Sequence, residues 1–123
     1  MANCQSQDLF VTRSLAMNRQ DTGAIIGIKG DILGAIVRIR DNQEIILGRD
    51  PYRCDLVIKG NRISRYHCSI MYMPNLESYR VVDYSLNGCF LEDNSRLNKE
   101  EPYQLLSGAE IKLGSNENVI KLG

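Results

Sequence analysis

The stretch that decides the fold is His67-Cys-Ser-Ile-Met-Tyr-Met-Pro-Asn-Leu-Glu-Ser-Tyr-Arg-Val-Val-Asp-Tyr84. It holds two runs rich in β-branched, aromatic and other apolar residues, and the turn signal Met-Pro-Asn separates them. In the second run, alternation places Tyr79, Val81 and Asp83 on one face and leaves the residues between them on the other. A period of two residues is typical of a strand, so the stretch predicts two neighbouring strands.

The same pattern continues along most of the chain. Short β-rich runs alternate with Gly, Pro, Asn and Asp, and beyond residue 23 no run of a dozen residues holds a helical period free of Gly and Pro. This spacing predicts an all-β sandwich or barrel over residues 23–123. Residues 1–22 are polar and mixed, which indicates a flexible leader or linker, with one short amphipathic helix around Leu9–Met17 as the alternative. The predicted strands span residues 24–29, 34–40, 44–48, 55–58, 67–73, 79–84, 88–92, 104–106, 109–113 and 118–122.

Composition narrows the function classes. The 123 residues suit one domain, and 15 basic and 15 acidic residues cancel, so no global field favours nucleic acid or a membrane surface. The longest apolar stretch, 32–37, is far shorter than the ~18 residues of a membrane span, and no signal peptide is recognisable. The four cysteines lack a C-x-x-C spacing. They favour free thiols in a reducing cytoplasm, although one of three disulfide connectivities remains possible in principle.

Residues 62–70 concentrate the reactive side chains. Ser64, His67 and Cys68 lie within five positions, and His67 is the only histidine. A nucleophile–base pair needs both side chains within hydrogen-bond reach, yet neighbouring strand residues point to opposite faces, which places Cys68 in the core. A metal site is disfavoured because the cysteines are dispersed, so no metal and no other cofactor is expected. The favoured interpretation is that His67 buttresses the loop.

Other residues indicate an anion site. Ser64 and Arg65 precede a strand, so a hydroxyl and a guanidinium share a tight loop. Arg49 ends the apolar run that begins at Ile45, and an arginine at a strand end can offer a bidentate fork to a phosphate. Asn87-Gly88 is a tight-turn signal before another predicted strand, and the asparagine amide can bind a peptide backbone.

Together these motifs resemble the signature of forkhead-associated (FHA) domains: Gly48-Arg49, Ser64-x-x-His67 and Asn87-Gly88. The separations also fit, with fifteen residues from Arg49 to Ser64 and twenty from His67 to Asn87. The resemblance covers residues 24–122. It implies a β-sandwich of about eleven mostly antiparallel strands, with a peptide site in the loops at one end. It further implies phosphothreonine-peptide binding and no enzymatic activity.

The resemblance also implies roles for individual residues. Arg49, Ser64 and Arg65 match positions that approach the phosphate or peptide, Asn87 matches the asparagine that holds the peptide main chain, and Arg62 matches a position that reads a downstream residue. Gly48, His67 and Gly88 match residues that shape the loops. Leu86 departs from the family, because many members have a phosphate-binding threonine there and leucine leaves only its backbone N–H. Cys89 also replaces a frequent threonine.

The implied partner is a phosphothreonine-containing protein, and therefore an upstream Ser/Thr kinase, with no nucleic acid and no membrane insertion. Leu86 supports an alternative, a phosphate-independent interaction or self-association domain. A cysteine hydrolase using Cys68 and His67 is the third hypothesis. Thr12 and Thr22 are the only threonines, so a phosphorylated leader that docks into its own or a neighbouring site is a further hypothesis.

Overall fold

Strands β5 (Cys68–Met73) and β6 (Ser78–Asp83) form an antiparallel hairpin around a short 3-10 turn, η2 (Pro74–Leu76). The computed structural model describes residues 22–123, and in it this hairpin is the longest strand pair of its sheet. Its register runs from Cys68 opposite Asp83 to Met73 opposite Ser78. The two predicted neighbouring strands are therefore confirmed as direct partners.

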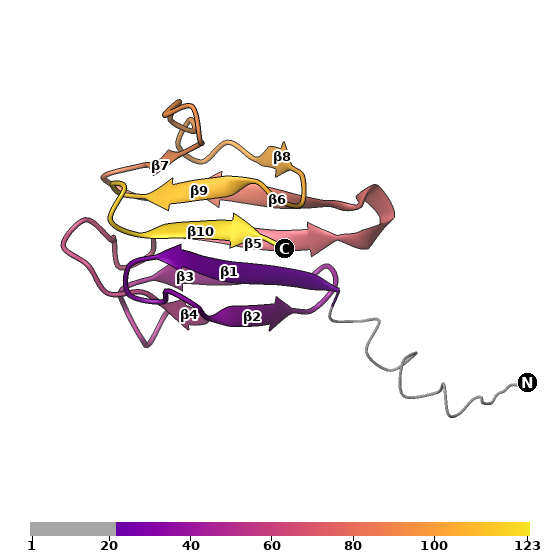
Figure 1. The fold of residues 1–123 in the computed structure, drawn as a ribbon, viewed down its shortest axis with the longest axis horizontal. Coiled ribbons are helices and arrows are strands. Elements are labelled where there is room, and N and C mark those ends of the chain that lie inside the picture. Colours follow the sequence, from indigo (N-terminus) through magenta and orange to yellow (C-terminus); the bar gives the residue numbers. More distant parts are fainter. Residues whose placement is uncertain (1–21) are drawn as a thin grey trace, which may run out of the picture.

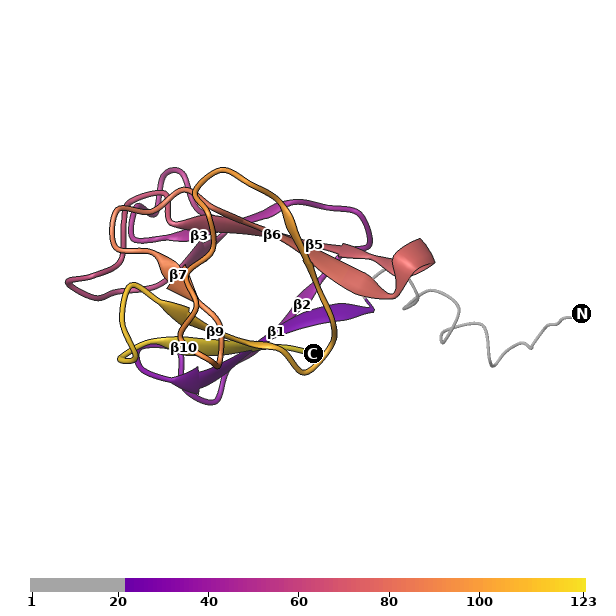
Figure 2. The same cartoon turned by 90° about the horizontal axis from the view of Figure 1, so that it is seen from above.

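Two five-stranded sheets pack face to face (Figure 1). Figure 2 shows the layers from above, with β3, β5 and β6 in one and β1, β9 and β10 in the other. Only β3 and β4 run parallel among the paired strands of the described part. The first sheet has the order β2 (Ile36–Ile39), β1 (Gly23–Lys29), β10 (Val119–Leu122), β9 (Glu110–Leu113), β7 (Cys89–Phe90). The second has the order β4 (Leu56–Val57), β3 (Ile45–Gly48), β5, β6, β8 (Tyr103–Leu105).

All ten predicted strands are present, and the all-β sandwich is confirmed. Several are shorter than predicted because their ends belong to turns. The run 88–92 keeps only Cys89–Phe90 as a strand, since the Leu91 N–H donates to the Ser95 carbonyl in a following turn (2.9 Å). The predicted leader lies outside the described residues, apart from Thr22. No helix within residues 22–123 is long and apolar enough to cross a bilayer.

The inward faces of both sheets form one apolar core. Tyr79 and Val81 share one face of β6, as their alternation predicts; both are buried, and Cys68 is buried among the same core residues. The core position predicted for Cys68 is thus confirmed, and the three described cysteines are free thiols. Burial of branched side chains from both sheets supplies the main stabilising free energy of such a sandwich.

Tyr79 links the two sheets through a polar contact inside this core. Its ring lies on β6, whereas its hydroxyl accepts a hydrogen bond from the Ala24 N–H on β1 (2.9 Å) and donates one to the Gly123 carbonyl. Ala24 is buried, so a water molecule does not readily take the place of the Tyr79 hydroxyl as the acceptor for the Ala24 N–H.

We expect Tyr79→Phe to lower the free energy of unfolding by about 1–3 kcal/mol, because it leaves a buried N–H and a carbonyl without their partner. Urea denaturation followed by circular dichroism measures this change. Tyr52→Phe is the control, since Tyr52 is 95% exposed and its stability effect should be negligible. Equal midpoints for both variants and the wild type would contradict the importance of this contact.

Candidate functional site

The predicted site residues gather at one end of the sandwich. The β3–β4, β4–β5, β6–β7 and β9–β10 connections lie there, together with the β1–β2 connection, at the left in Figure 1. The β5–β6 turn and the beginning of β1 lie at the opposite end. Residues far apart in sequence therefore become neighbours because their strands end at the same edge.

Arg49 lies beside Ser64 because the two loop backbones pair. The Arg49 N–H donates to the Ser64 carbonyl (2.9 Å), and the Asp50 N–H donates to the Arg65 carbonyl (3.2 Å). The Arg49 Nε donates to the Ile63 carbonyl (3.1 Å), which orients an otherwise exposed guanidinium. Within residues 22–123 the other Arg49 nitrogens and the exposed Arg65 guanidinium have no hydrogen-bonding partner, so two cationic groups are available on the paired loops that carry the Ser64 hydroxyl.

The Ser64 hydroxyl joins this loop to the β6–β7 loop. Its oxygen accepts a hydrogen bond from the Leu86 N–H (3.0 Å), and the Asn87 amide donates to the Arg62 carbonyl (3.3 Å). The sequence analysis left only the Leu86 N–H at this position for a phosphate, and in this structure Ser64 accepts it. The consequence is favourable for Ser64: its oxygen is held in place while its own O–H remains free to donate to an anion.

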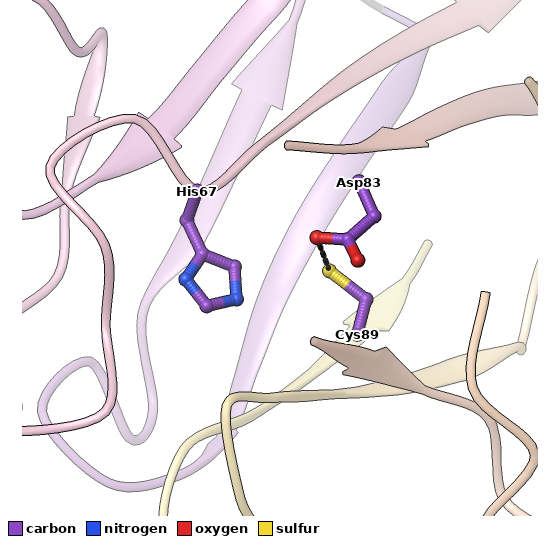
Figure 3. Close-up of side chains that lie close together, drawn as sticks. All are labelled: His67, Asp83 and Cys89. Atoms are coloured by element: carbon purple, nitrogen blue, oxygen red, sulfur yellow. Dashed lines mark hydrogen bonds between the residues drawn. The ribbon is translucent and has the colours of Figure 1, made fainter. Parts of the chain in front are cut away.

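His67 lies buried beneath both loops (Figure 3). Its Nδ1 accepts a hydrogen bond from the Ser64 N–H (3.0 Å), so its Nε2 carries the proton and donates to the Gly88 carbonyl (3.0 Å). Burial lowers the pKa of His67 below its ordinary value of 6.5, although the Gly88 carbonyl and the Asp83 carboxylate act in the opposite direction. A neutral imidazole therefore spans the two loops with both nitrogens occupied by backbone groups.

The β6–β7 loop is held by residues to which the sequence analysis assigned no role. Asp83 is fully buried, and its Oδ1 accepts from the Ser85 N–H (2.9 Å) and hydroxyl (2.6 Å). The Ser85 hydroxyl in turn accepts from the Gly88 N–H (2.7 Å). Arg96 donates to the Leu86 carbonyl (3.1 Å) from outside. Only the Asp-x-Ser spacing signalled part of this network, because Asp and Ser side chains often bond nearby backbone N–H groups.

Two glycines permit the close approach of these loops. A Cβ on Gly48 would lie 2.3 Å from the Arg65 carbonyl oxygen, so a side chain there would push the β4–β5 loop away. Gly88 adopts φ +98°, and a Cβ there would lie 2.7 Å from the Arg96 Nε. Asn87-Gly88 leads into β7, as predicted, and its loop crosses from one sheet to the other, because β6 and β7 belong to different sheets.

His67, Asp83 and Cys89 are the group of potential metal ligands found within residues 22–123, with ligand atoms within 4.8 Å of one another (Figure 3). The Cys89 thiol donates to Asp83 Oδ1 (3.4 Å). A hydrogen bond with the Cys68 thiol, together with burial, raises the pKa of Cys89 well above its usual value. A metal ligand must lose that proton. The arrangement therefore suits a buried hydrogen-bonded brace, although Asp83 Oδ2 has no partner in the described part.

Comparisons with known proteins agree with this architecture. The sequence model of the FHA domain matches residues 45–114. A protein phosphatase 1 regulatory inhibitor subunit PPP1R8 homolog from Arabidopsis thaliana is 27% identical over 82 residues, which are 67% of this chain but 22% of that protein. The chain thus spans about a fifth of that relative's length.

Two solved structures extend the comparison. The FHA domain of an Arabidopsis thaliana hypothetical protein has a TM-score of 0.73 and 26% identity, covering 82% of this chain and 83% of that one. The N-terminal FHA domain of S. cerevisiae Rad53p, solved with a phosphothreonine peptide, has a TM-score of 0.67 and 20% identity, covering 81% and 90%. At that identity the second likeness supports the fold alone.

The buried neutral imidazole predicts a stability that depends on pH. The unfolded chain binds a proton at His67 near pH 6.5, whereas the folded chain binds it only at lower pH. The His67 contribution is therefore complete above pH 6.5 and falls as the pH drops through the folded-state pKa, by at most ~1.4 kcal/mol per pH unit. Because His67 is the only histidine, its ring C–H resonances report this pKa directly in a pH titration by NMR. A folded-state pKa at or above 6.5 would contradict the brace.

Proposed function

Because the chain belongs to the FHA-domain family, we propose that it is a phosphothreonine-peptide-binding module that mediates phosphorylation-dependent protein–protein interaction. The observation that carries the proposal is the pairing of the Arg49 and Ser64 loops, which places a guanidinium beside a hydroxyl. Relatives solved with phosphothreonine peptides support it, among them the Rad53p domain. The module acts by binding and does not catalyse a reaction.

In this proposal a phosphothreonine brings ~1.5–2 negative charges and three strong acceptor oxygens. Arg49 and Arg65 supply the opposing charge, and the free O–H of Ser64 donates to a phosphate oxygen. Asn87 bonds the peptide backbone, and its own contact with the Arg62 carbonyl keeps its amide near the site. His67, Gly48 and Gly88 act indirectly, by holding the loops at their mutual distance.

The partner is then a protein phosphorylated on threonine by a Ser/Thr kinase. We place this interaction in the cytoplasm, because the described cysteines are free thiols and the chain has no global charge that favours other surfaces. Self-association through a phosphorylated leader would use Thr12 or Thr22, and a phosphate on Thr22 would reach a neighbouring molecule's site rather than its own. The Thr22 hydroxyl donates to Asp41 (2.6 Å), and Thr22 precedes β1 at the end of the sandwich opposite the loops.

A phosphate-independent interaction domain is the second candidate, and Leu86 favours it. This side chain is 77% exposed at the centre of the proposed site, where an apolar group suits an unmodified partner. The two candidates separate in one binding measurement, because only the first requires phosphate on the peptide.

Binding of a phosphothreonine peptide library, compared with its unphosphorylated form, tests the proposal. We expect binding only with phosphate, weaker at higher salt because the ligand is charged. Arg49→Ala should reduce affinity roughly ten- to hundred-fold, since hydrogen bonds to charged groups contribute ~1.5–3 kcal/mol. Isothermal titration calorimetry measures the change.

Arg38→Ala is the matched control, because Arg38 is also exposed but lies on β2 outside these loops. It should leave affinity unchanged. Equal binding of phosphorylated and unphosphorylated peptides, or full affinity in Arg49→Ala, would reject the phosphate site and favour the second candidate.

Leu86→Thr restores the hydroxyl that many family members have at this position. We expect it to raise affinity for a phosphothreonine peptide by about one decade, because it adds one hydrogen bond to a charged group. Folding should not change, since the side chain is exposed. Leu106→Thr is the control, because Leu106 is similarly exposed (66%) on the β8–β9 connection. The same affinity in both variants would show that residue 86 does not face the phosphate.

A further inference from the structure

A cavity of about 320 Å³ lies beside the Arg62 side of the proposed peptide site. This volume is on the order of ten water molecules, at the small end of ligand pockets. Its walls come from the β4–β5 loop, β7, β9, the β7–β8 connection and the β9–β10 turn. The lining residues are Arg62, Phe90, Asn94, Lys112, Gly114, Ser115 and Asn116. Only Arg62 is shared with the predicted peptide-binding residues.

The fold brings two cations from distant sequence to this cavity. Lys112 on β9 lies directly opposite Phe90 on β7 in the strand register. Arg62 reaches the same cavity from the β4–β5 loop, where its Nε donates to the Gly114 carbonyl (3.5 Å). The Gly114 N–H donates to the Gly88 carbonyl (2.8 Å), so this wall is continuous with the loop that carries Asn87.

Most of the positive charge in the cavity is unused. Lys112 donates one hydrogen bond, to the Asn94 side chain, and its other protons have no partner within residues 22–123. Neither terminal nitrogen of Arg62 has a partner there. No Asp or Glu lines the cavity. Asp93 interacts electrostatically with Lys112, but its Oδ1 already accepts from the Ser95 N–H (3.0 Å) and hydroxyl (2.6 Å).

The chemistry of the lining selects the class of ligand. Two cations match the ~1.5–2 negative charges of a phosphate monoester better than the single charge of a carboxylate. Asn94, Ser115 and Asn116 add neutral polar groups for the remaining oxygens. Phe90 offers an apolar wall for the carbon atoms of the side chain that carries the phosphate. In a chain with no net charge, such a pocket is a local anion site.

We propose that this cavity is a second phosphate subsite, so that the preferred ligand is a doubly phosphorylated segment of one peptide chain. The proposal rests on the proposed function, since the first phosphothreonine anchors the peptide at Arg49 and Ser64. The cavity then meets the second phosphate at the high effective concentration of an intramolecular event. Even if the cavity alone binds phosphate weakly, it then raises the affinity for the whole peptide. The module thereby distinguishes a segment phosphorylated twice from one phosphorylated once.

The test is a peptide series with one fixed phosphothreonine and a second phosphoserine moved through successive positions on either side. We expect at least a tenfold gain in affinity at a narrow set of positions, and little gain when glutamate replaces the second phosphoserine. Lys112→Gln should remove most of that gain while leaving affinity for the singly phosphorylated peptide unchanged. Lys121→Gln is the matched control, because Lys121 is also partly buried on a strand of the same sheet but does not line the cavity.

A gain that is equal at every position, or that persists in Lys112→Gln, would overturn the proposal, because general charge attraction then explains it. If the singly phosphorylated peptide does not bind in an Arg49-dependent manner, the proposed function fails instead. In that case the cavity is tested separately: inorganic phosphate is titrated into the protein, and the NMR chemical shifts of the Ser115 and Asn116 amides are followed. Shifts that disappear in Lys112→Gln support the anion site, whereas their absence in the wild type overturns it.

Discussion

The geometry of the proposed site depends on one buried imidazole. His67 accepts a hydrogen bond from the Ser64 N–H and donates one to the Gly88 carbonyl, so two loops from different parts of the sequence are held by one rigid ring. The Ser64 hydroxyl then accepts the Leu86 N–H, and Asn87 contacts the Arg62 carbonyl. Without the imidazole, the Ser64 N–H would need another partner, which costs ~1–3 kcal/mol, whereas the Gly88 carbonyl would keep its bond from the Gly114 N–H.

The backbone groups of the two loops bond to one another, to His67 and to Ser64. The side-chain polar atoms that face solvent therefore remain available for a ligand. The Arg49 guanidinium is oriented by a single backbone contact, and Ser64 keeps its proton for an acceptor. Charge is likewise distributed locally: equal numbers of acidic and basic residues leave no overall field, yet Arg49 and Arg65 lie on paired loops, and Arg62 and Lys112 line one cavity. The proposed recognition therefore depends on locally placed cations and not on net charge.

Much of the fold was predictable from residues alone. Tyr79 and Val81 share one face because a strand points successive side chains to opposite faces, and both are buried in the core, although Val82 on the other face is buried as well. The motif residues required the resemblance, since their spacing along the chain says nothing about their distance in space. Asn87-Gly88 was predicted as a turn before a new strand, and β7 does begin after it; the turn signal says nothing of the sheet that β7 joins, because it records local backbone preference. The occupied Leu86 N–H was missed for the same reason: its partner is 22 residues away.

By itself, the sequence determined that the chain forms short strands around one apolar core, and which residues it offers for binding an anion. Local periodicity and turn residues carry that information, because they act within a few positions. Only the tertiary structure decided which strands share a sheet, that Asp83, Ser85 and Arg96 hold the β6–β7 loop, and that Lys112 shares a cavity with Arg62. The physical reason is that these contacts form between segments whose proximity arises only when the two sheets pack together and bury their inner faces.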